Sequence, residues 1–473
     1  MRPTLVFSTL LILFLPLNAQ GQVAANLILA EGHPWGGSTV ESVNPPFVNG
    51  LGQVGFNAIL ADGSISIVFD GEQRLNFASD IVTGAESSVG FGNAGQFIFG
   101  PISPTGTDSV RNQNGLLLVA NTQAPGFDPG VISTFHSGAT ITDDGTAYWS
   151  SGFDDGLGEE FSEGKMLYRR TPDGSIDVVV RSGDVIDGET IDGRRFDVGL
   201  GRHKVSRNNA NLMFIFTARD GNPGIDYKLS VNQKVVAATG ELSGDGDVWG
   251  YFDLLTINNA GNYAFSGETI GFSLGDDFIA YNGDIQLREN DRIAQGTLVG
   301  GAFAGLSGVG GVQLNESNEL AFTWNLDDGS GVKETLFFAS DASDLSNLDV
   351  VASVGDEIDT NGDGFADWIL ADFNSSSNRS GIGLTEEGTI YVEVELGRLD
   401  GSDTTVEAIV SFPIAGSGFL LGDVNRDNVV DFDDISPFIN LLATDGYQVD
   451  ADFNQDQSVD FDDIAPFIIL LSN

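Results

Sequence analysis

Two twelve-residue segments near the carboxyl end carry oxygen-bearing side chains at the spacing of a calcium-binding loop. Ca²⁺ takes roughly six to eight oxygen ligands, and such loops supply them from positions 1, 3, 5, 7, 9 and 12, with position 7 giving its backbone carbonyl. Those positions hold Asp423, Asn425, Asp427, Val429, Asp431 and Asp434 in the first segment, and Asp452, Asn454, Asp456, Ser458, Asp460 and Asp463 in the second. The sequence therefore predicts two bound Ca²⁺ ions.

Both loops depart from the commonest calcium-loop pattern. Position 6, usually Gly, is Asn428 in one loop and Gln457 in the other, and position 12 is Asp instead of Glu. The alternative is a solvated acidic run, but two copies with one spacing disfavour it. Residues 421–473 carry twelve Asp and one Arg, so these carboxylates repel one another without a metal. We expect this tail to fold on adding Ca²⁺.

Apolar residues at helical spacing follow each loop, with a Pro in the expected first turn, where a missing N–H costs little. They are Ile435, Phe438, Ile439 and Leu442 with Pro437, and Ile464, Phe467, Ile468 and Leu471 with Pro466. Each unit is thus predicted to be a loop followed by one short amphipathic helix. No incoming helix is evident before the first loop, and residues 414–420 have the composition of a linker.

Duplicated loop-helix units of this kind resemble the type I dockerin family over residues 421–473. The resemblance implies Ca²⁺-dependent binding to a cohesin-like module, and hence attachment of a secreted protein to a scaffold or cell surface. In that family, loop positions near 10 and 11 help to select the partner. Here they are Phe432, Asp433, Phe461 and Asp462.

The amino terminus has the features of a secretory signal peptide. One Arg precedes an apolar run from Leu5 to Leu17, and Ala19 and Gly21 offer small residues for cleavage. We predict a signal peptide over residues 1–21, export, and no membrane insertion after cleavage. An uncleaved amino-terminal anchor is the alternative. The chain has no Cys, and its net charge of −47 disfavours nucleic acid or an anionic membrane as a partner.

The body, residues 25–413, is a repeat of two alternating motifs. The first reads Asn-x-x-Gly-x-hydrophobic-small-Phe, a turn followed by a strand with one buried face, and begins at Asn49, Gly92, Thr142, Asn208, Asn258, Asn315 and Thr385. The second is a short apolar strand ending in a polar turn, and begins at Leu27, Leu75, Leu117, Val178, Val235, Ile285 and Val350. Seven copies at this spacing predict an all-β fold, a seven-bladed β-propeller, with a β-solenoid or tandem sandwiches as alternatives. The repeat resembles bacterial secreted proteins with tandem NxxGxxAF units and variable carboxy-terminal anchors, which implies architecture but no activity.

The ends of the body suggest how such a propeller would close. The first strand, Leu27–Ala30, could complete the last sheet beside Val406–Phe412 and so remove an open edge. Phe56, Phe265 and Phe322, at the end of their motif copies, are predicted core residues.

A third acidic cluster lies within the body. Asp359, Asn361, Asp363 and Asp367 occupy loop positions 1, 3, 5 and 9, but position 12 is Leu370, so the closing carboxylate is missing. The sequence allows either a weaker third Ca²⁺ site or a plain Asn/Gly/Asp turn, and favours the turn.

Signals for catalysis are poor. His33, His136 and His203 are scattered without metal-ligand spacing and are expected to be surface or strand residues. Trp149 and Trp324 fit the core, whereas Trp249 could contact a ligand such as a polysaccharide. Acidic pairs are too numerous for a glycosidase pair to be chosen. The favoured interpretation is a non-catalytic binding module displayed through a calcium tail; the alternative is a dockerin-borne polysaccharide-degrading hydrolase or lyase.

Overall fold

The computed structural model describes most of the body and part of the tail. The described residues are 23–77, 89–101, 107–156, 163–192, 202–218, 226–244, 246–270, 277–300, 308–361, 365–373, 381–399, 404–414, 424, 432–444, 451, 459, 461, 463–464 and 467–468. Within these ranges the body consists of strands and turns, which confirms the all-β prediction. The described tail contains the 3-10 turn η1 (Phe432–Asp434) and the helix α1 (Ile435–Thr444). Over the same ranges, no helix has the length and apolar character needed to cross a bilayer.

Seven sheets of four or more strands make up the described body. Each contains an antiparallel run of four strands, which from the axis outward are β5 (Phe47–Val48), β6 (Val54–Leu60), β7 (Ile65–Phe69) and β8 (Glu72–Phe77); β9 (Val89–Phe91), β10 (Phe97–Phe99), β11 (Ser109–Asn112) and β12 (Gly115–Val119); β13 (Ile132–Ile141), β14 (Ala147–Asp154), β15 (Glu163–Arg170) and β16 (Ile176–Arg181); β19 (His203–Val205), β20 (Leu212–Thr217), β21 (Tyr227–Val231) and β22 (Lys234–Ala238); β23 (Val248–Ile257), β24 (Tyr263–Ile270), β25 (Asp277–Tyr281) and β26 (Asp284–Arg288); β29 (Val309–Leu314), β30 (Leu320–Asp327), β31 (Val332–Ala339) and β32 (Asp349–Ser353); and β35 (Ile382–Leu384), β36 (Thr389–Arg398), β37 (Thr405–Pro413) and β2 (Asn26–Ala30).

Short strands extend some of these sheets. They are β1 (Val23–Ala24), β3 (Pro34–Trp35), β4 (Ser38–Val43), β17 (Val185–Ile186), β18 (Glu189–Thr190), β27 (Arg292–Ile293), β28 (Gly296–Val299), β33 (Glu357–Asp359) and β34 (Trp368–Phe373). Of these, β17 and β18 form a separate hairpin.

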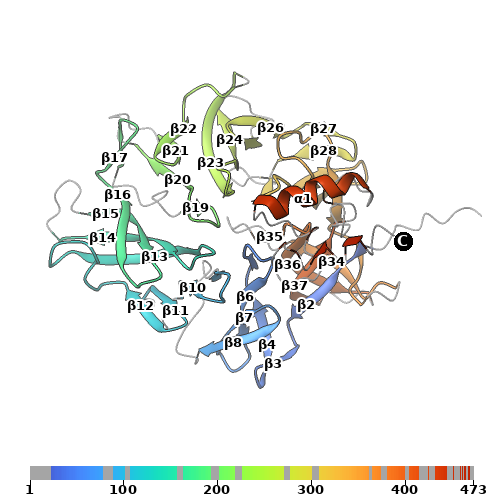
Figure 1. Ribbon diagram of the computed structural model, residues 1–473, viewed down its shortest axis with the longest axis horizontal. Helices are drawn as coiled ribbons and strands as arrows, with labels where there is room; N and C mark the ends of the chain where they lie inside the picture. The colour runs from blue at the N-terminus through green and yellow to red at the C-terminus, as the bar shows by residue number, and fades with distance from the viewer. Residues whose placement is uncertain are drawn as a thin grey trace, which may run out of the picture.

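The innermost strands form a closed ring of contacts in the order β5, β9, β13, β19, β23, β29, β35 and back to β5. Figure 1 shows the sheets arranged around one central axis. The β-propeller prediction is therefore confirmed.

The first motif forms the turn between the innermost and second strands. A Gly or Asn at its fourth position adopts a positive φ, which these two residue types tolerate best: Gly52, Gly95, Gly145, Asn209, Gly261, Asn318 and Gly388. The fourth copy begins at Ser206 and not at Asn208 as predicted. Its one extra residue is real, because the Ser206 N–H donates to the carbonyl of Asn211, one position later than in the other turns.

The second motif forms the outermost strand of each sheet. In every sheet the register between the third and fourth strands shifts once, at a β-bulge, as in the pairings β7–β8, β21–β22 and β2–β37. A bulge increases the local twist of a strand. The same irregularity in each sheet shows that the seven share one design, and Phe56, Phe265 and Phe322 are fully buried as predicted.

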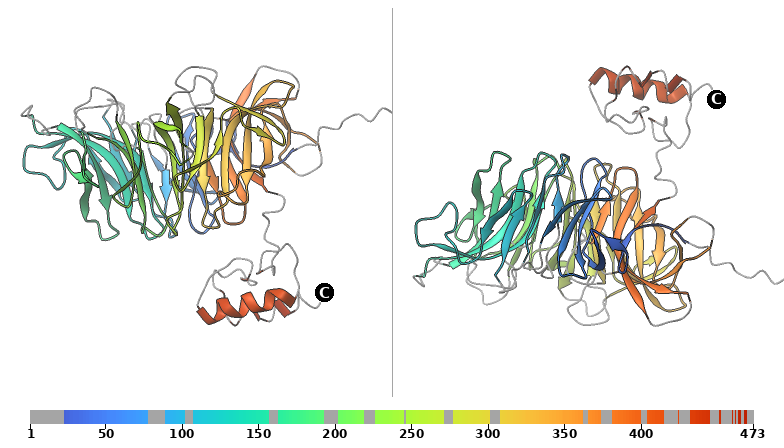
Figure 2. Two further views of the ribbon diagram at one scale, coloured as in Figure 1. Left: turned by 90° about the horizontal axis from the view of Figure 1, so that it is seen from above. Right: turned by 90° about the horizontal axis from the view of Figure 1, so that it is seen from below.

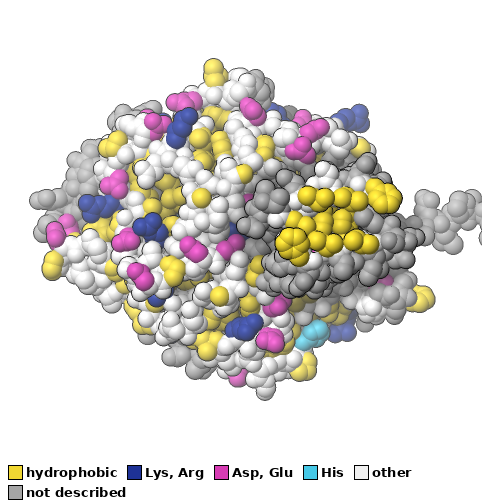
Figure 3. Space-filling view, in the orientation of Figure 1, with side chains coloured by type: hydrophobic (Ala, Val, Ile, Leu, Met, Phe, Trp, Pro, Cys, Tyr) yellow, Lys and Arg dark blue, Asp and Glu magenta, His cyan; other side chains and the backbone are white. Residues whose placement is uncertain are grey.

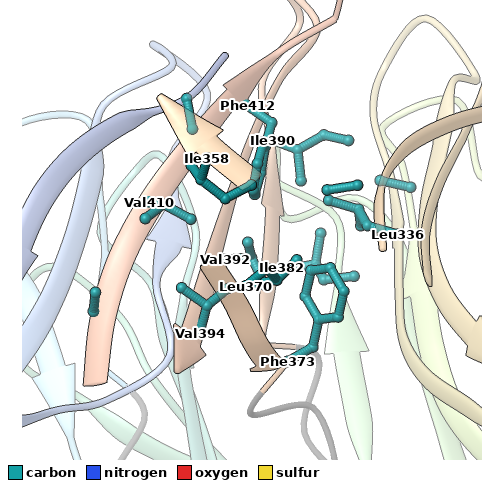
Figure 4. Packing of buried hydrophobic residues seen from close by; sticks show 14 of the residues in the cluster. Leu336, Ile358, Leu370, Phe373, Ile382, Ile390, Val392, Val394, Val410 and Phe412 are labelled. Atoms are coloured by element: carbon teal, nitrogen blue, oxygen red, sulfur yellow. The ribbon is translucent and has the colours of Figure 1, made fainter. Parts of the chain in front are cut away.

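The predicted closure is present. Strand β2 pairs antiparallel with β37, with Leu27 opposite Val410 and Ala30 opposite Ala408, and β1 pairs parallel with β33. Figure 4 shows the core of this closing sheet, where Val410 and Phe412 pack with side chains from β33 to β36. Strands from both ends of the body thus share one sheet, which covers the edge of β37.

The body has two faces, seen edge-on in Figure 2. We call the face formed by the seven first-motif turns the turn face. The Ile414 N–H donates to the carbonyl of Gly388 in the seventh turn at 3.0 Å. The chain therefore leaves the body at the turn face on its way to the tail.

Candidate functional site

The last residue of each predicted calcium loop is buried. The side chains of Asp434 and Asp463 are both 0 % exposed, and Val424 and Val459 are buried near them in sequence. The other predicted ligands, Asp423, Asn425, Asp427, Val429, Asp431, Asp452, Asn454, Asp456, Ser458 and Asp460, lie outside the described residues, as does Asp462, and nothing is described of the Asp433 side chain. Burial of a carboxylate is costly unless donors or a cation compensate it. The two buried carboxylates suit a cation site, and the Ca²⁺ assignment remains a prediction.

The tail has a small apolar core with the same residues from each repeat. The rings of Phe438 and Phe467 pack with centroids 4.7 Å apart, and both side chains are buried. Helix α1 confirms the predicted helix after the first loop. The prediction that Ile439 and Ile468 belong to the buried faces is wrong, since each is 57 % exposed.

Exposed apolar side chains also occur at matching positions of the two repeats. Phe432 is 75 % exposed and Phe461 80 % exposed, so four large apolar residues, two from each repeat, face solvent. Figure 3 shows hydrophobic side chains gathered in the region of α1. Among the described residues this is a concentrated exposed apolar group, a feature typical of interaction surfaces.

A second organised region lies where the seven turns meet on the turn face. In three turns the first-position Asn donates from its side-chain amide to the carbonyl that begins the next turn: Asn49 to Gly92, Asn258 to Asn315 and Asn315 to Thr385, at 3.5, 3.2 and 3.1 Å. The amide oxygen of Asn315 meanwhile accepts the Glu319 N–H within its own turn. This Asn therefore both shapes its own turn and connects neighbouring sheets.

The second position of several turns carries a carboxylate that accepts backbone N–H groups of another turn. The Gly50 N–H donates to Asp143 Oδ1 at 3.0 Å, the Asn259 N–H to Glu316 Oε2 at 2.7 Å, and the Glu316 N–H to Glu386 Oε1 at 3.0 Å. Burial raises the pKa of Asp143, partly offset by the Gly50 N–H and Arg207. Burial likewise raises the pKa of Glu316, partly offset by the Asn259 N–H.

Arg207 occupies the same second position in the fourth turn and supplies the opposite charge. Its guanidinium donates to Glu386 Oε1 at 3.2 Å and to the Leu384 carbonyl at 3.1 Å. We call Asp143, Arg207, Glu316 and Glu386 the turn-ring residues. Sequence analysis missed them, although aligning the copies at their second position would have grouped them. Their bonds to backbone groups indicate a role in holding the sheets together.

The third acidic loop is held by hydrogen bonds among its own residues. Asp367 Oδ2 accepts both the N–H and the hydroxyl of Thr360, at 2.9 and 2.8 Å, and Asp367 Oδ1 accepts the Asn361 amide at 3.0 Å. Asp359 Oδ1 accepts the Asn361 N–H at 3.2 Å, and Asp363 lies outside the described residues. In the described part of the chain, no group of three or more His, Asp or Glu is arranged to hold a metal.

The other residues singled out in the sequence occupy structural positions. Trp149 and Trp324 are fully buried, as predicted. Trp249, considered as a ligand contact, is only 3 % exposed and packs against Phe278 with centroids 5.0 Å apart, so that expectation is wrong. His136 is a buried strand residue, and burial lowers its pKa from 6.5 to about 4.

No family model matches this chain, and no curated protein matches it. Among solved structures, it is similar to the Dos1 propeller, with 11% identity, 80% of each chain covered and a TM-score of 0.38. It is also similar to the β-propeller domain of the Trilobed protease from Pyrococcus furiosus, with 9% identity, 77% of this chain and 96% of that chain covered, and a TM-score of 0.42. Polysaccharide lyase Uly1 matches at 9% identity over 79% of this chain and 77% of that chain, with a TM-score of 0.30. These likenesses concern the fold, which the described sheets establish independently.

Proposed function

We propose that this is a secreted binding protein, which attaches through a Ca²⁺-dependent dockerin-like tail to a cohesin-like partner and displays the propeller for binding. The observation that carries the proposal is the correspondence between the two tail repeats. Asp434 and Asp463 are buried at the same loop position, while Phe432 and Phe461 are exposed at the same position two residues earlier. Buried acidic ends suit ion coordination, and exposed aromatic residues suit a partner surface.

We also propose that the body has seven blades. The support is that each of the seven sheets contains the same four-strand run and the same bulge, and that seven innermost strands form the ring. A count of six would leave one of these sheets unassigned, because no described strand pairing joins two of them.

The experiment measures binding of the full chain to immobilised type I cohesin modules by surface plasmon resonance, with Ca²⁺ and with chelator. We expect binding that requires Ca²⁺ and is lost in the Phe432→Ser/Phe461→Ser variant. The matched control is Leu116→Ser, which changes an exposed apolar residue of the body and should leave binding unchanged. Binding that persists in chelator, or in the double Phe variant, would contradict the proposal.

A further inference from the structure

An open pocket of about 430 Å³ lies at the outer hairpin of the closing sheet. It is lined by Thr360, Asn361, Asp367, Trp368, Arg398 and Leu399. This volume falls within the usual range for small-molecule sites. The pocket is separate from the turn-ring residues and from the tail, and no role has been given to it above.

One wall of the pocket is an aromatic side chain held by the sheet. Trp368 stands opposite Arg398 in the β34–β36 register and opposite Ile358 in the β33–β34 register, so the three side chains project from the same face. Ile358 is fully buried, and Trp368 packs against that core while remaining part of the pocket lining. The indole is thereby fixed in place, with one part available to a ligand.

The polar wall of the pocket is also pre-ordered. Asp367 accepts hydrogen bonds from Thr360 and from the Asn361 amide, which holds the loop against the start of β34. Arg398 is exposed, and its side chain has no hydrogen bond or ion pair with any other described residue. Fixed hydroxyl, amide, carboxylate and guanidinium groups provide donors and acceptors beside an aromatic surface.

We propose that this pocket binds a neutral oligosaccharide, with sugar C–H groups against Trp368 and hydroxyls bonded by Arg398 and Asn361. Sugar hydroxyls both donate and accept hydrogen bonds, which matches the mixed polar lining. The net charge of −47 disfavours a polyanionic glycan. Exposed apolar residues Phe365 and Leu399, 74 % and 46 % exposed, would extend the contact beyond one sugar unit. The inference deepens the proposed function by naming a ligand class for the body.

The test is isothermal titration of the full chain with cellohexaose, mannohexaose, xylohexaose and laminarihexaose, in buffer containing Ca²⁺. We expect one of them to bind with one site per chain. Trp368→Leu should weaken its affinity at least about tenfold, and Arg398→Gln several-fold. The matched controls are Trp35→Leu, in the β3–β4 hairpin, and Arg74→Gln, an exposed Arg of β8, and neither should change the affinity.

Because Trp368 also packs on the core, circular dichroism and thermal unfolding accompany the Trp368→Leu titration. Arg398→Gln is exposed and provides the independent variant. The proposal is overturned if no hexasaccharide binds at millimolar concentration, if an acidic oligosaccharide binds in preference, or if both pocket variants retain the parent affinity. Saccharide binding that survives in Asp434→Asn/Asp463→Asn would show that the pocket acts independently of the tail, so failure of the docking proposal would leave this one standing.

Discussion

The guanidinium of Arg207 donates to the carboxylate of Glu386 at 3.2 Å, although 179 positions separate them in the chain. Arg207 belongs to the turn between β19 and β20, and Glu386 to the turn between β35 and β36. The same carboxylate accepts the N–H groups of Glu316 and Ser317. One ion pair on the turn face therefore links three sheets of the propeller.

Replacement of Arg207 by Gln should lower the free energy of unfolding by about 2 kcal/mol, because it leaves Glu386 partly buried without its cation. The two side chains are only 15 % and 22 % exposed. The control is Arg169→Gln, which breaks an ion pair with Asp177 at 41 % and 53 % exposure and should cost well under 1 kcal/mol. Urea denaturation measures both, and equal losses would contradict the role given to Arg207.

Replacement of Asn315 by Ala should cost about 2 kcal/mol or more, because it removes buried hydrogen bonds to the Thr385 carbonyl and the Glu319 N–H. Asn315 is 1 % exposed. Asn347→Ala, which removes an exposed contact with the Ser346 hydroxyl, is the matched control and should be near neutral. A near-neutral Asn315→Ala would mean that the first-motif Asn only shapes its turn.

Titration of the full chain with Ca²⁺ should reveal two tail sites and a gain of helical circular dichroism signal. Asp434→Asn and Asp463→Asn should each remove or strongly weaken one of them, since position 12 supplies a carboxylate ligand. The control is Asp341→Asn, which alters an exposed carboxylate that caps Ser343 and should leave both sites intact. Unchanged calorimetric stoichiometry in both loop variants would refute the ligand assignment.

Acid should destabilise the body through His136. Burial lowers its folded pKa from 6.5 to about 4, so between these values the unfolded chain binds a proton that the folded chain does not. The contribution is complete above about pH 6.5 and falls as the pH drops toward 4, with a loss of about 2 kcal/mol near pH 5. His136→Leu should flatten this part of the pH–stability curve measured by urea denaturation. An unchanged slope would assign the acid sensitivity to other groups.

Local pattern alone was enough to predict the all-β body, the positive-φ turns, the buried Phe56 and Phe322, and the closure by Leu27–Ala30. These features depend on residue type at short spacing: Gly or Asn where φ is positive, and alternating apolar residues where one face of a strand is buried. The calcium loops were predicted in the same way, from oxygen ligands at fixed positions. Helix α1 followed from apolar spacing, although that spacing wrongly placed Ile439 inside.

Tertiary structure alone decided what the turns and strands bring together. Arg207 and Glu386 come from motif copies far apart in the chain, and only closure of the ring places them in contact. Trp249 stands in a Gly- and Asp-rich stretch that suggested a loop, yet packing against Phe278 buries it. Trp368 and Arg398 drew no attention in the sequence, and the register of β34 against β36 sets them side by side. Local spacing fixes backbone conformation and which face is apolar, whereas contacts between distant segments depend on how the sheets pack and close.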